Sequence, residues 1–182
     1  MTKHFTFFLL LIIAVNLFPV CTLGESKDSL GVRKAVMGFQ DDWNQHNMEA
    51  FGKLFTIDAY FVNVAGAPMK GRENIQMHHA WAHGAIPSDT KVAGTSAANY
   101  GIFKNSTMLF TKIDINFLRK DVAVAHVLWE LQGDARTSGD PRHGTLMFVL
   151  TRHDRAWLIA TAQNTEGNSK ALRYLITSSL RK

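Results

Sequence analysis

The fold of this chain is decided by residues 108–132, which read MLFTKIDINFLRKDVAVAHVLWELQ. Two segments rich in β-branched and aromatic residues are separated here only by Arg119, Lys120 and Asp121, and both are typical of strands. A connector this short pairs consecutive strands antiparallel. Strand-like segments continue along the second half of the chain, which predicts an antiparallel meander over residues 108–118, 122–132, 145–152 and 156–165.

The first half of the chain predicts helices. Apolar residues recur at helical spacing over residues 26–45, with Ser26 or Ser29 as the N-cap. Asn47 is a good N-cap for a shorter helix over residues 48–55, and helical spacing returns over residues 71–83. A strand is predicted over residues 60–64, and residues 84–105 predict a loop, with a mobile lid as one interpretation.

Helices followed by a run of strands indicate an α+β fold. An antiparallel sheet this apolar needs cover on one face, which the three N-terminal helices can supply. We therefore predict a cone-shaped, curved antiparallel sheet covered by three N-terminal helices. The open end of such a cone is a natural pocket for a small molecule.

The two ends of the chain differ from its body. Residues 1–24 are typical of a signal peptide, with charge at Lys3, an apolar run and a small-residue cleavage pattern ending at Gly24. The apolar run is shorter than the roughly 20 residues that span a bilayer, so we expect no stable membrane anchor. The expected product is exported, periplasmic or secreted, with one domain over residues 25–166 and a basic C-terminal tail over residues 167–182.

Charge and cysteine content exclude several classes of function. The net charge is +5, but residues 25–165 carry 15 basic and 14 acidic side chains, so the body is almost neutral. Nucleic-acid binding needs a concentrated basic face and is not expected. The only cysteine, Cys21, lies in the predicted signal peptide, which leaves no thiol for a disulfide or a catalytic nucleophile. No dinucleotide fingerprint is present, and we expect no cofactor.

Several stretches, in order along the chain, resemble a SnoaL-like domain of the nuclear transport factor 2-like superfamily. In the first half these are WNQHN (43–47), FGKLF (51–55), DAYFVNVAG (58–66) and KGRENI (70–75). In the second half, DVAVAH (121–126), WELQG (129–133) and WLIATAQNT (157–165) resemble the SgcJ/EcaC branch. The resemblance covers roughly residues 30–166 and implies the cone fold, with pairing of two copies through the sheet. It does not specify a function, because this fold hosts isomerases, dehydratases, hydrolases and plain binding proteins.

Residues 35–66 can also be laid without gaps on the helix-helix-strand unit of steroid isomerases, which resemble this fold. Their hydrogen-bonding tyrosine then falls on Phe39 and their aspartate base on Asn63. Phenylalanine has no hydroxyl, and an amide cannot accept a proton near neutral pH, so that isomerisation is not expected. A tyrosine of the family's third helix falls on His79, which becomes the candidate general acid or base.

Further pocket residues are suggested by residue type and strand alternation. The aromatic residues Phe39, Trp43 and Phe61 fit either a pocket wall or an ordinary core. Trp129 alternates with Glu130 on one strand, and we expect Trp129 to face inward. One of Gln163 and Asn164 must face the covered side, as part of either a binding site or a structural hydrogen-bond network. The predicted ligand-binding set is Phe39, Trp43, Phe61, Asn63, His79, Trp129 and Gln163.

A histidine cluster in the third predicted helix suggests zinc as an alternative. His79 and His83 have the i, i+4 spacing that places two imidazoles on one helix face, but a zinc site needs a third ligand that no motif supplies. We therefore expect no metal site. Three functions remain open: binding of an apolar or cyclic organic molecule in the cone, an SgcJ/EcaC-type oxidoreductase or an isomerase or dehydratase that uses His79, and a dimeric interaction module.

Overall fold

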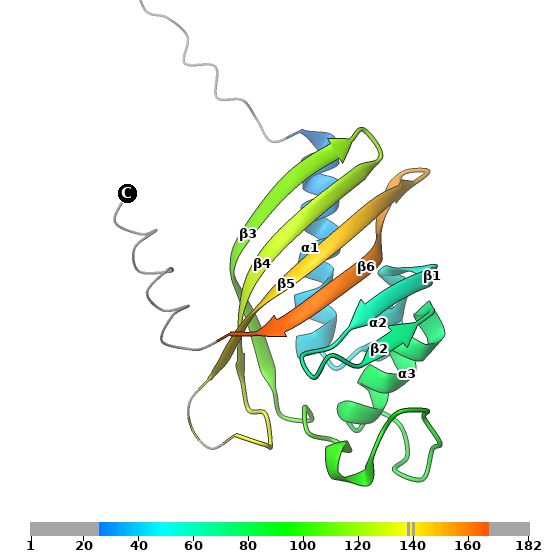
Figure 1. The fold of residues 1–182 in the computed structure, drawn as a ribbon, viewed down its shortest axis with the longest axis vertical. Helices are drawn as coiled ribbons and strands as arrows, with labels where there is room; N and C mark the ends of the chain where they lie inside the picture. The colour runs from blue at the N-terminus through cyan, green and yellow to red at the C-terminus, as the bar shows by residue number, and fades with distance from the viewer. Residues whose placement is uncertain (1–25, 138, 140, 168–182) are drawn as a thin grey trace, which may run out of the picture.

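The computed structural model describes residues 26–137, 139 and 141–167 (Figure 1). The predicted signal peptide lies outside these residues, as does all but the first residue of the predicted tail. The described part of the chain has the predicted α+β architecture: three α-helices and a six-stranded sheet with the strand order β2-β1-β6-β5-β4-β3. No helix within it is long and apolar enough to cross a membrane.

The three helices form where capping and apolar spacing predicted them. Helix α1 spans Lys27–Asn44, and the Ser26 hydroxyl caps it by accepting from the Ser29 N–H at 3.1 Å. Helix α2 spans Met48–Lys53, with Asn47 accepting from the Ala50 N–H in the same way. Helix α3 spans Arg72–Ala82. Helix α2 ends earlier than predicted because Phe55 already belongs to the first strand.

The sheet contains the predicted meander together with one pairing that was missed. Strands β3 to β6 pair antiparallel in sequence order, but β1 pairs parallel with β6. The short edge strand β2, which begins at Pro68, was also missed. Proline is tolerated as the first residue of an edge strand. The strands are β1 Phe55–Val62, β2 Pro68–Lys70, β3 Thr107–Arg119, β4 Val122–Gln132, β5 Arg142–His153 and β6 Ala156–Glu166.

β-Bulges help to bend the sheet into its curved shape. The register shifts at Thr111 in β3 and at Ala160 in β6, where one residue has no partner in the neighbouring strand. A bulge bends its strand and reverses the alternation of side chains beyond it. On β6, Trp157 and Ile159 are buried before the bulge, whereas Ala162 is buried after it.

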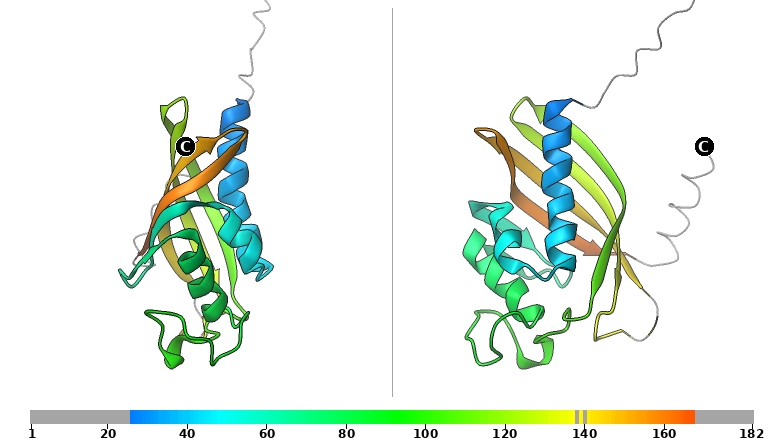
Figure 2. Two further views of the ribbon diagram at one scale, coloured as in Figure 1. Left: turned by 90° about the vertical axis from the view of Figure 1, so that its right-hand side faces the viewer. Right: turned by 180° about the vertical axis from the view of Figure 1, so that it is seen from behind.

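The helices cover the concave face of the sheet, and the core lies between the two layers (Figure 2). Helix α1 packs closely on β6 because residue 31 is glycine: a Cβ there would lie 2.7 Å from the Trp157 ring. Helix α1 also bonds the bent strand β3, where Asn44 accepts from the Met108 N–H and donates to its carbonyl. Gln40 accepts from the Phe110 N–H at 2.6 Å. These contacts hold α1 across the sheet.

The loop between α3 and β3 is tied to the open end of the cone. The Phe103 N–H donates to the Ala82 carbonyl at 2.9 Å, and the Ala135 N–H donates to the Ile102 carbonyl at 2.9 Å. The Tyr100 hydroxyl donates to the Ile86 carbonyl at 2.8 Å. The loop is therefore bonded to α3, to itself and to the β4–β5 connection.

Candidate functional site

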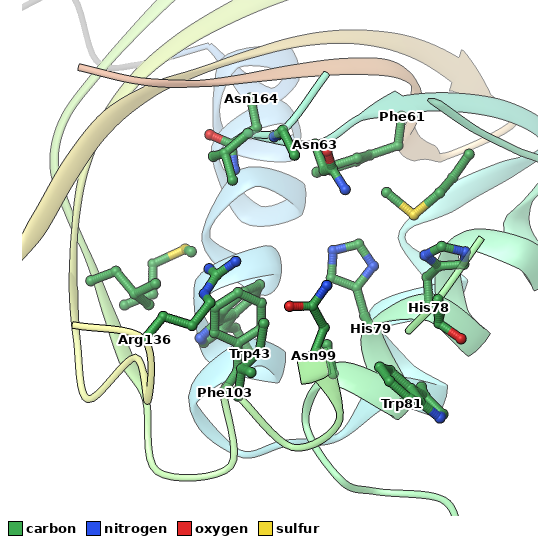
Figure 3. Close-up of a pocket in the computed structure, with 18 of the residues that line it drawn as sticks. Trp43, Phe61, Asn63, His78, His79, Trp81, Asn99, Phe103, Arg136 and Asn164 are labelled. Atoms are coloured by element: carbon green, nitrogen blue, oxygen red, sulfur yellow. Dashed lines mark hydrogen bonds between the residues drawn. The ribbon is translucent and has the colours of Figure 1, made fainter. Parts of the chain in front are cut away.

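A cavity of about 150 Å³ lies at the open end of the cone, between the helices, the sheet and the loop after α3. Its apolar wall combines residues from every layer of the fold (Figure 3). The apolar and aromatic lining residues include Trp43, Phe61, Met69, Trp81, Ile102, Phe103, Met108, Trp129 and Leu131.

Five of the predicted site residues meet at this cavity: Trp43, Phe61, Asn63, His79 and Trp129. They come from α1, β1, the turn after β1, α3 and β4. The expected orientation of Trp129 is confirmed, because its side chain is buried while Glu130 is directed to the other face of the sheet. The cone topology therefore brings residues 43 and 129 into one wall.

Phe39 does not line the cavity, which corrects the prediction that it binds ligand. Its side chain is completely buried, and its ring lies 4.6–6.4 Å between centroids from six other aromatic rings. Those rings surround Phe39 and leave it no access to the cavity. Phe39 is a core residue, the second of the two interpretations that its residue type allowed.

Gln163 does not reach the cavity either, and Asn164 takes the predicted position. Counting inward residues by twos from Trp157 and Ile159 places Gln163 inside. The bulge at Ala160 reverses that alternation, so Gln163 is exposed on the outer face. Asn164 lines the cavity instead, and its Oδ1 accepts from the Trp129 indole N–H at 2.9 Å.

The imidazole of His79 has one nitrogen committed to the helix. Nδ1 lies 2.7 Å from the carbonyl oxygen of Ile75, one turn earlier in α3. Because a carbonyl can only accept, Nδ1 carries the proton and Nε2 of the neutral ring is an acceptor. Figure 3 shows the ring directed into the cavity, and no described residue bonds its Nε2.

Burial controls the charge of His79. Its removal from water lowers the pKa to about 4, even though the hydrogen bond to Ile75 acts in the opposite direction. The rings of Phe51 and Phe61, with centroids at 4.6 and 5.2 Å, provide much of this apolar environment. At neutral pH, His79 is therefore an uncharged side chain with a fixed tautomer.

Asn63 has its oxygen committed to the turn that joins β1 and β2. Its Oδ1 accepts from the Ala65 N–H at 2.9 Å and from the Ala67 N–H at 3.0 Å. The side-chain NH₂ group remains, and Figure 3 shows it on the cavity side, facing His79. Asn63 therefore offers the cavity a donor. Asn164 does the same, since its oxygen is taken by Trp129.

The β4–β5 connection and the start of β5 each add an arginine that the sequence did not single out. Arg136 and Arg142 line the cavity, and both bond Asp134, whose side chain is fully buried. Burial alone would raise the pKa of Asp134, but the hydrogen bonds from Arg136 and Arg142 outweigh it and hold the pKa below its usual value. Asp134 is therefore a carboxylate shared by two guanidinium groups. Arg142 also forms a two-point ion pair with Glu166.

Three more polar lining residues carried no sequence signal for a cavity, and Asn164 was missed for a different reason. Asn99 and Thr95 lie in the loop after α3, and His78 joins them from α3. Asn164 had been weighed against Gln163, and only the position of the bulge decides between them. Strand alternation could have found Asn164 if the bulge had been visible in the sequence.

The three histidines of α3 and its C-cap do not converge on one point as metal ligands would. The ring of His78 bonds the Ala93 carbonyl, and His83 Nδ1 lies 2.7 Å from His46 Nδ1. The Trp43 ring is in edge contact with both His79 and His83. Within the described residues, no group of three or more histidine, cysteine or acidic side chains is placed to hold a metal ion.

Solved structures with the same architecture are found across bacteria. An uncharacterised protein with a cystatin-like fold from Caulobacter vibrioides has a TM-score of 0.63 at 20% identity, over 86% of this chain and 100% of its own. An NTF2-like protein from Novosphingobium aromaticivorans has a TM-score of 0.60 at 15% identity, over 82% and 88%. The fold is nuclear transport factor 2-like.

A third neighbour of this nuclear transport factor 2-like chain is described as a candidate scytalone dehydratase from Novosphingobium aromaticivorans. It has a TM-score of 0.59 at 10% identity, over 78% of this chain and 85% of its own. No protein-family profile and no curated protein matches the chain. Identities this low establish the nuclear transport factor 2-like fold, whereas the SgcJ/EcaC branch remains a prediction.

Proposed function

We propose that this protein binds a small cyclic organic molecule in the cone cavity. The observation that carries the proposal is the cavity itself, with aromatic walls, a fixed acceptor at His79 Nε2 and amide donors from Asn63 and Asn164. Apolar walls with a few convergent polar groups are typical of small-molecule sites. An apolar cavity of about 150 Å³ can hold one benzene ring. A single ring is therefore the expected size of the buried part of the ligand.

The affinities of two related ligands distinguish a binding role for His79 from a purely structural one. Calorimetry compares phenol, whose O–H can donate to His79 Nε2, with anisole, which has no such donor. Loss of a buried hydrogen bond costs about 1–3 kcal/mol, so phenol is expected to bind about fivefold to a hundredfold more tightly. In His79→Phe the two affinities become equal. The control His153→Phe, at an exposed position at the end of β5, keeps the preference. Failure of both compounds to bind would remove the proposal.

Proton transfer by His79 is the alternative function. It is favoured by the fixed tautomer, which presents an unprotonated Nε2 to the cavity. Two neighbours are described as a candidate dehydratase and a candidate aromatic ring hydroxylase, in line with enzymatic members of the fold. Against it stands the low pKa of His79, about 4, because general bases are most effective when their pKa lies near the working pH. We therefore place binding first and an SgcJ/EcaC-type oxidoreductase, isomerase or dehydratase second.

The enzymatic alternative has a direct test. Wild type and His79→Ala are incubated with single-ring ketones in deuterated water, and deuterium incorporation next to the carbonyl carbon is followed by mass spectrometry. Exchange that is catalysed by wild type and lost in His79→Ala would establish proton transfer. Equal background exchange in both proteins would leave binding as the function.

We also propose that two copies pair through the outer face of the sheet. Partly exposed Val124, Leu128 and Val149 lie on the same face as Met147, whose exposed fraction is 40%. Exposed His126 and Gln163 pair with Met147 from the two neighbouring strands. An apolar stripe on the uncovered face of an antiparallel sheet is suited to pairing with a second copy. Sedimentation at micromolar concentration is expected to show a dimer, and Met147→Lys a monomer. A wild-type monomer would contradict the pairing and the dimeric interaction module with it.

Export with cleavage near Gly24 completes the proposal, on the basis of the sequence of residues 1–24. Expression of the full chain followed by intact mass measurement of the protein outside the inner membrane tests it. The expected product begins at residue 25. Retention of residues 1–24 in a cytoplasmic product would contradict export.

A further inference from the structure

The charges around the cavity are all of one sign. The polar lining residues include Arg136 and Arg142, two histidines and three asparagines, and none of the residues that line the cavity is an aspartate or a glutamate. The two carboxylates that balance the arginines, Asp134 and Glu166, lie outside the lining. A cavity with this lining favours an anion.

Arg136 retains donor capacity toward the cavity. Its Nε and Nη2 donate to the two oxygens of Asp134 at 2.9 and 2.7 Å, and within the described residues its Nη1 donates to none. Its guanidinium carbon lies 5.3 Å from the centre of the Phe103 ring, which also lines the cavity. Figure 3 shows Arg136 and His79 directed toward the same space from different sides.

The surrounding carboxylate does not cancel this capacity. Asp134 and Glu166 together balance the charges of Arg136 and Arg142, but both carboxylates lie outside the lining, whereas the two guanidinium groups line the cavity. Glu166 bonds Arg142, through Nε and Nη2. Arg136 therefore faces the cavity as a fixed cation whose orientation is already set by Asp134.

The remaining polar groups complement an anion with one O–H or N–H group. Asn63 and Asn164 present amide donors, because their oxygens are bonded within the fold. His79 Nε2 is an acceptor whose position and tautomer are set by the bond from Nδ1 to Ile75. A ligand that fits this arrangement carries an acceptor-rich group near Arg136 and a donor near His79.

We propose that the ligand is a single-ring carboxylic acid, bound as its anion with the carboxylate at Arg136 and a ring hydroxyl at His79. The aromatic walls formed by Trp43, Phe103 and Trp129 hold the ring. This inference rests on the proposed binding function and adds the chemical class of the ligand.

Calorimetry with 4-hydroxybenzoate and its neutral isostere 4-hydroxybenzamide tests the proposal on the mature chain. Charge-assisted hydrogen bonds contribute enough that wild type is expected to bind the acid at least about tenfold more tightly than the amide. Arg136→Gln is expected to bind both equally. Arg136→Lys keeps a cation beside Asp134 and is expected to retain part of the preference, which covers the case in which the glutamine variant does not fold. Arg119→Gln, on the exposed β3–β4 turn, is the matched control.

The outcomes separate the two proposals. Equal affinity for acid and amide in wild type overturns the carboxylic acid, while binding of a single ring still stands. A preference for the acid that survives in a folded Arg136→Gln variant also overturns it, because the carboxylate is then bound elsewhere. Failure of 4-hydroxybenzoate, 4-hydroxybenzamide and phenol alike to bind would instead remove the proposed function itself.

Discussion

His79 Nδ1 donates to the carbonyl oxygen of Ile75, one turn earlier in α3, over a distance of 2.7 Å. This bond decides which nitrogen of the imidazole meets the cavity and in which form. With Nδ1 protonated and the ring buried, Nε2 is an acceptor at neutral pH. The hydrogen-bonding character of the site thus depends on a contact inside the helix.

Stability is expected to fall between pH 7 and pH 5. The pKa of His79 is about 4 in the folded chain against 6.5 as its ordinary value, so the unfolded chain takes up a proton first as the pH falls. The free energy of unfolding is then lower by about 2 kcal/mol at pH 5 from this residue alone. Burial also lowers the pKa of His83, to about 3, which acts in the same direction. Urea denaturation at the two pH values measures the change.

The matched variants isolate the part that belongs to His79. His79→Phe removes the titrating group and is expected to lose about 2 kcal/mol less than wild type over this interval. His153→Phe, at an exposed position at the end of β5, is expected to keep the wild-type dependence. Identical pH dependence in wild type and His79→Phe would show that His79 is not held neutral by burial.

Phe39 is expected to matter for stability and not for binding. Phe39→Ala removes a fully buried ring from an aromatic cluster and should lower the free energy of unfolding by about 3–5 kcal/mol. Phe39→Leu keeps most of the volume and allows the binding measurement in a folded protein. Phenol affinity in Phe39→Leu should lie close to wild type. A large loss of affinity in this variant would restore Phe39 to the site.

Two variants of Asn63 are expected to distinguish its role in stabilising the turn from its role in the cavity. Asn63→Ala leaves the Ala65 and Ala67 N–H groups without their acceptor and should cost about 1–2 kcal/mol of stability. Asn63→Asp keeps an accepting oxygen, so its stability should stay within about 1 kcal/mol of wild type. Its new carboxylate repels an anion, and the affinity for 4-hydroxybenzoate should fall more than that for phenol. A fall of equal size for both ligands would contradict an anion-binding cavity.

Gly144 keeps the Trp129 wall in place. A Cβ at position 144 would clash with the Trp129 indole and the Thr165 carbonyl oxygen. Gly144→Ala is therefore expected to destabilise the fold by about 1–3 kcal/mol and to weaken phenol binding. Gly38→Ala in α1 is the contrast, because its Cβ meets only the end of the Leu54 side chain at 3.0 Å and alanine favours a helix. Chemical denaturation of both variants measures the difference, and equal stability would contradict it.

Local patterns in the sequence were sufficient to predict the helices and the antiparallel meander. Ser26 and Asn47 cap helices where their side chains predicted caps, and β4 begins and ends where alternation placed it. The parallel pairing of β1 with β6 joins residues about a hundred positions apart, and no local pattern reports such a contact. The edge strand β2 has only three residues, too few to show a period.

The site was predicted in part, for identifiable reasons. His79 and Asn63 emerged from the resemblance to steroid isomerases, and both line the cavity. The prediction that Gln163 lines the cavity was wrong because a bulge at Ala160 reverses the alternation of side chains on β6. Arg136 and Asn99 lie in connections without periodicity, where a residue reaches the cavity only through tertiary contacts.

The imidazole nitrogen resonances of His79, recorded at pH 7 before and after addition of phenol, test the central claim most directly. The free protein should show Nδ1 protonated and Nε2 unprotonated, and saturation with phenol should shift the Nε2 resonance while Nδ1 changes little. A proton on Nε2 in the free protein, or an Nε2 resonance that does not move at saturation, would contradict a cavity in which His79 accepts a hydrogen bond from its ligand.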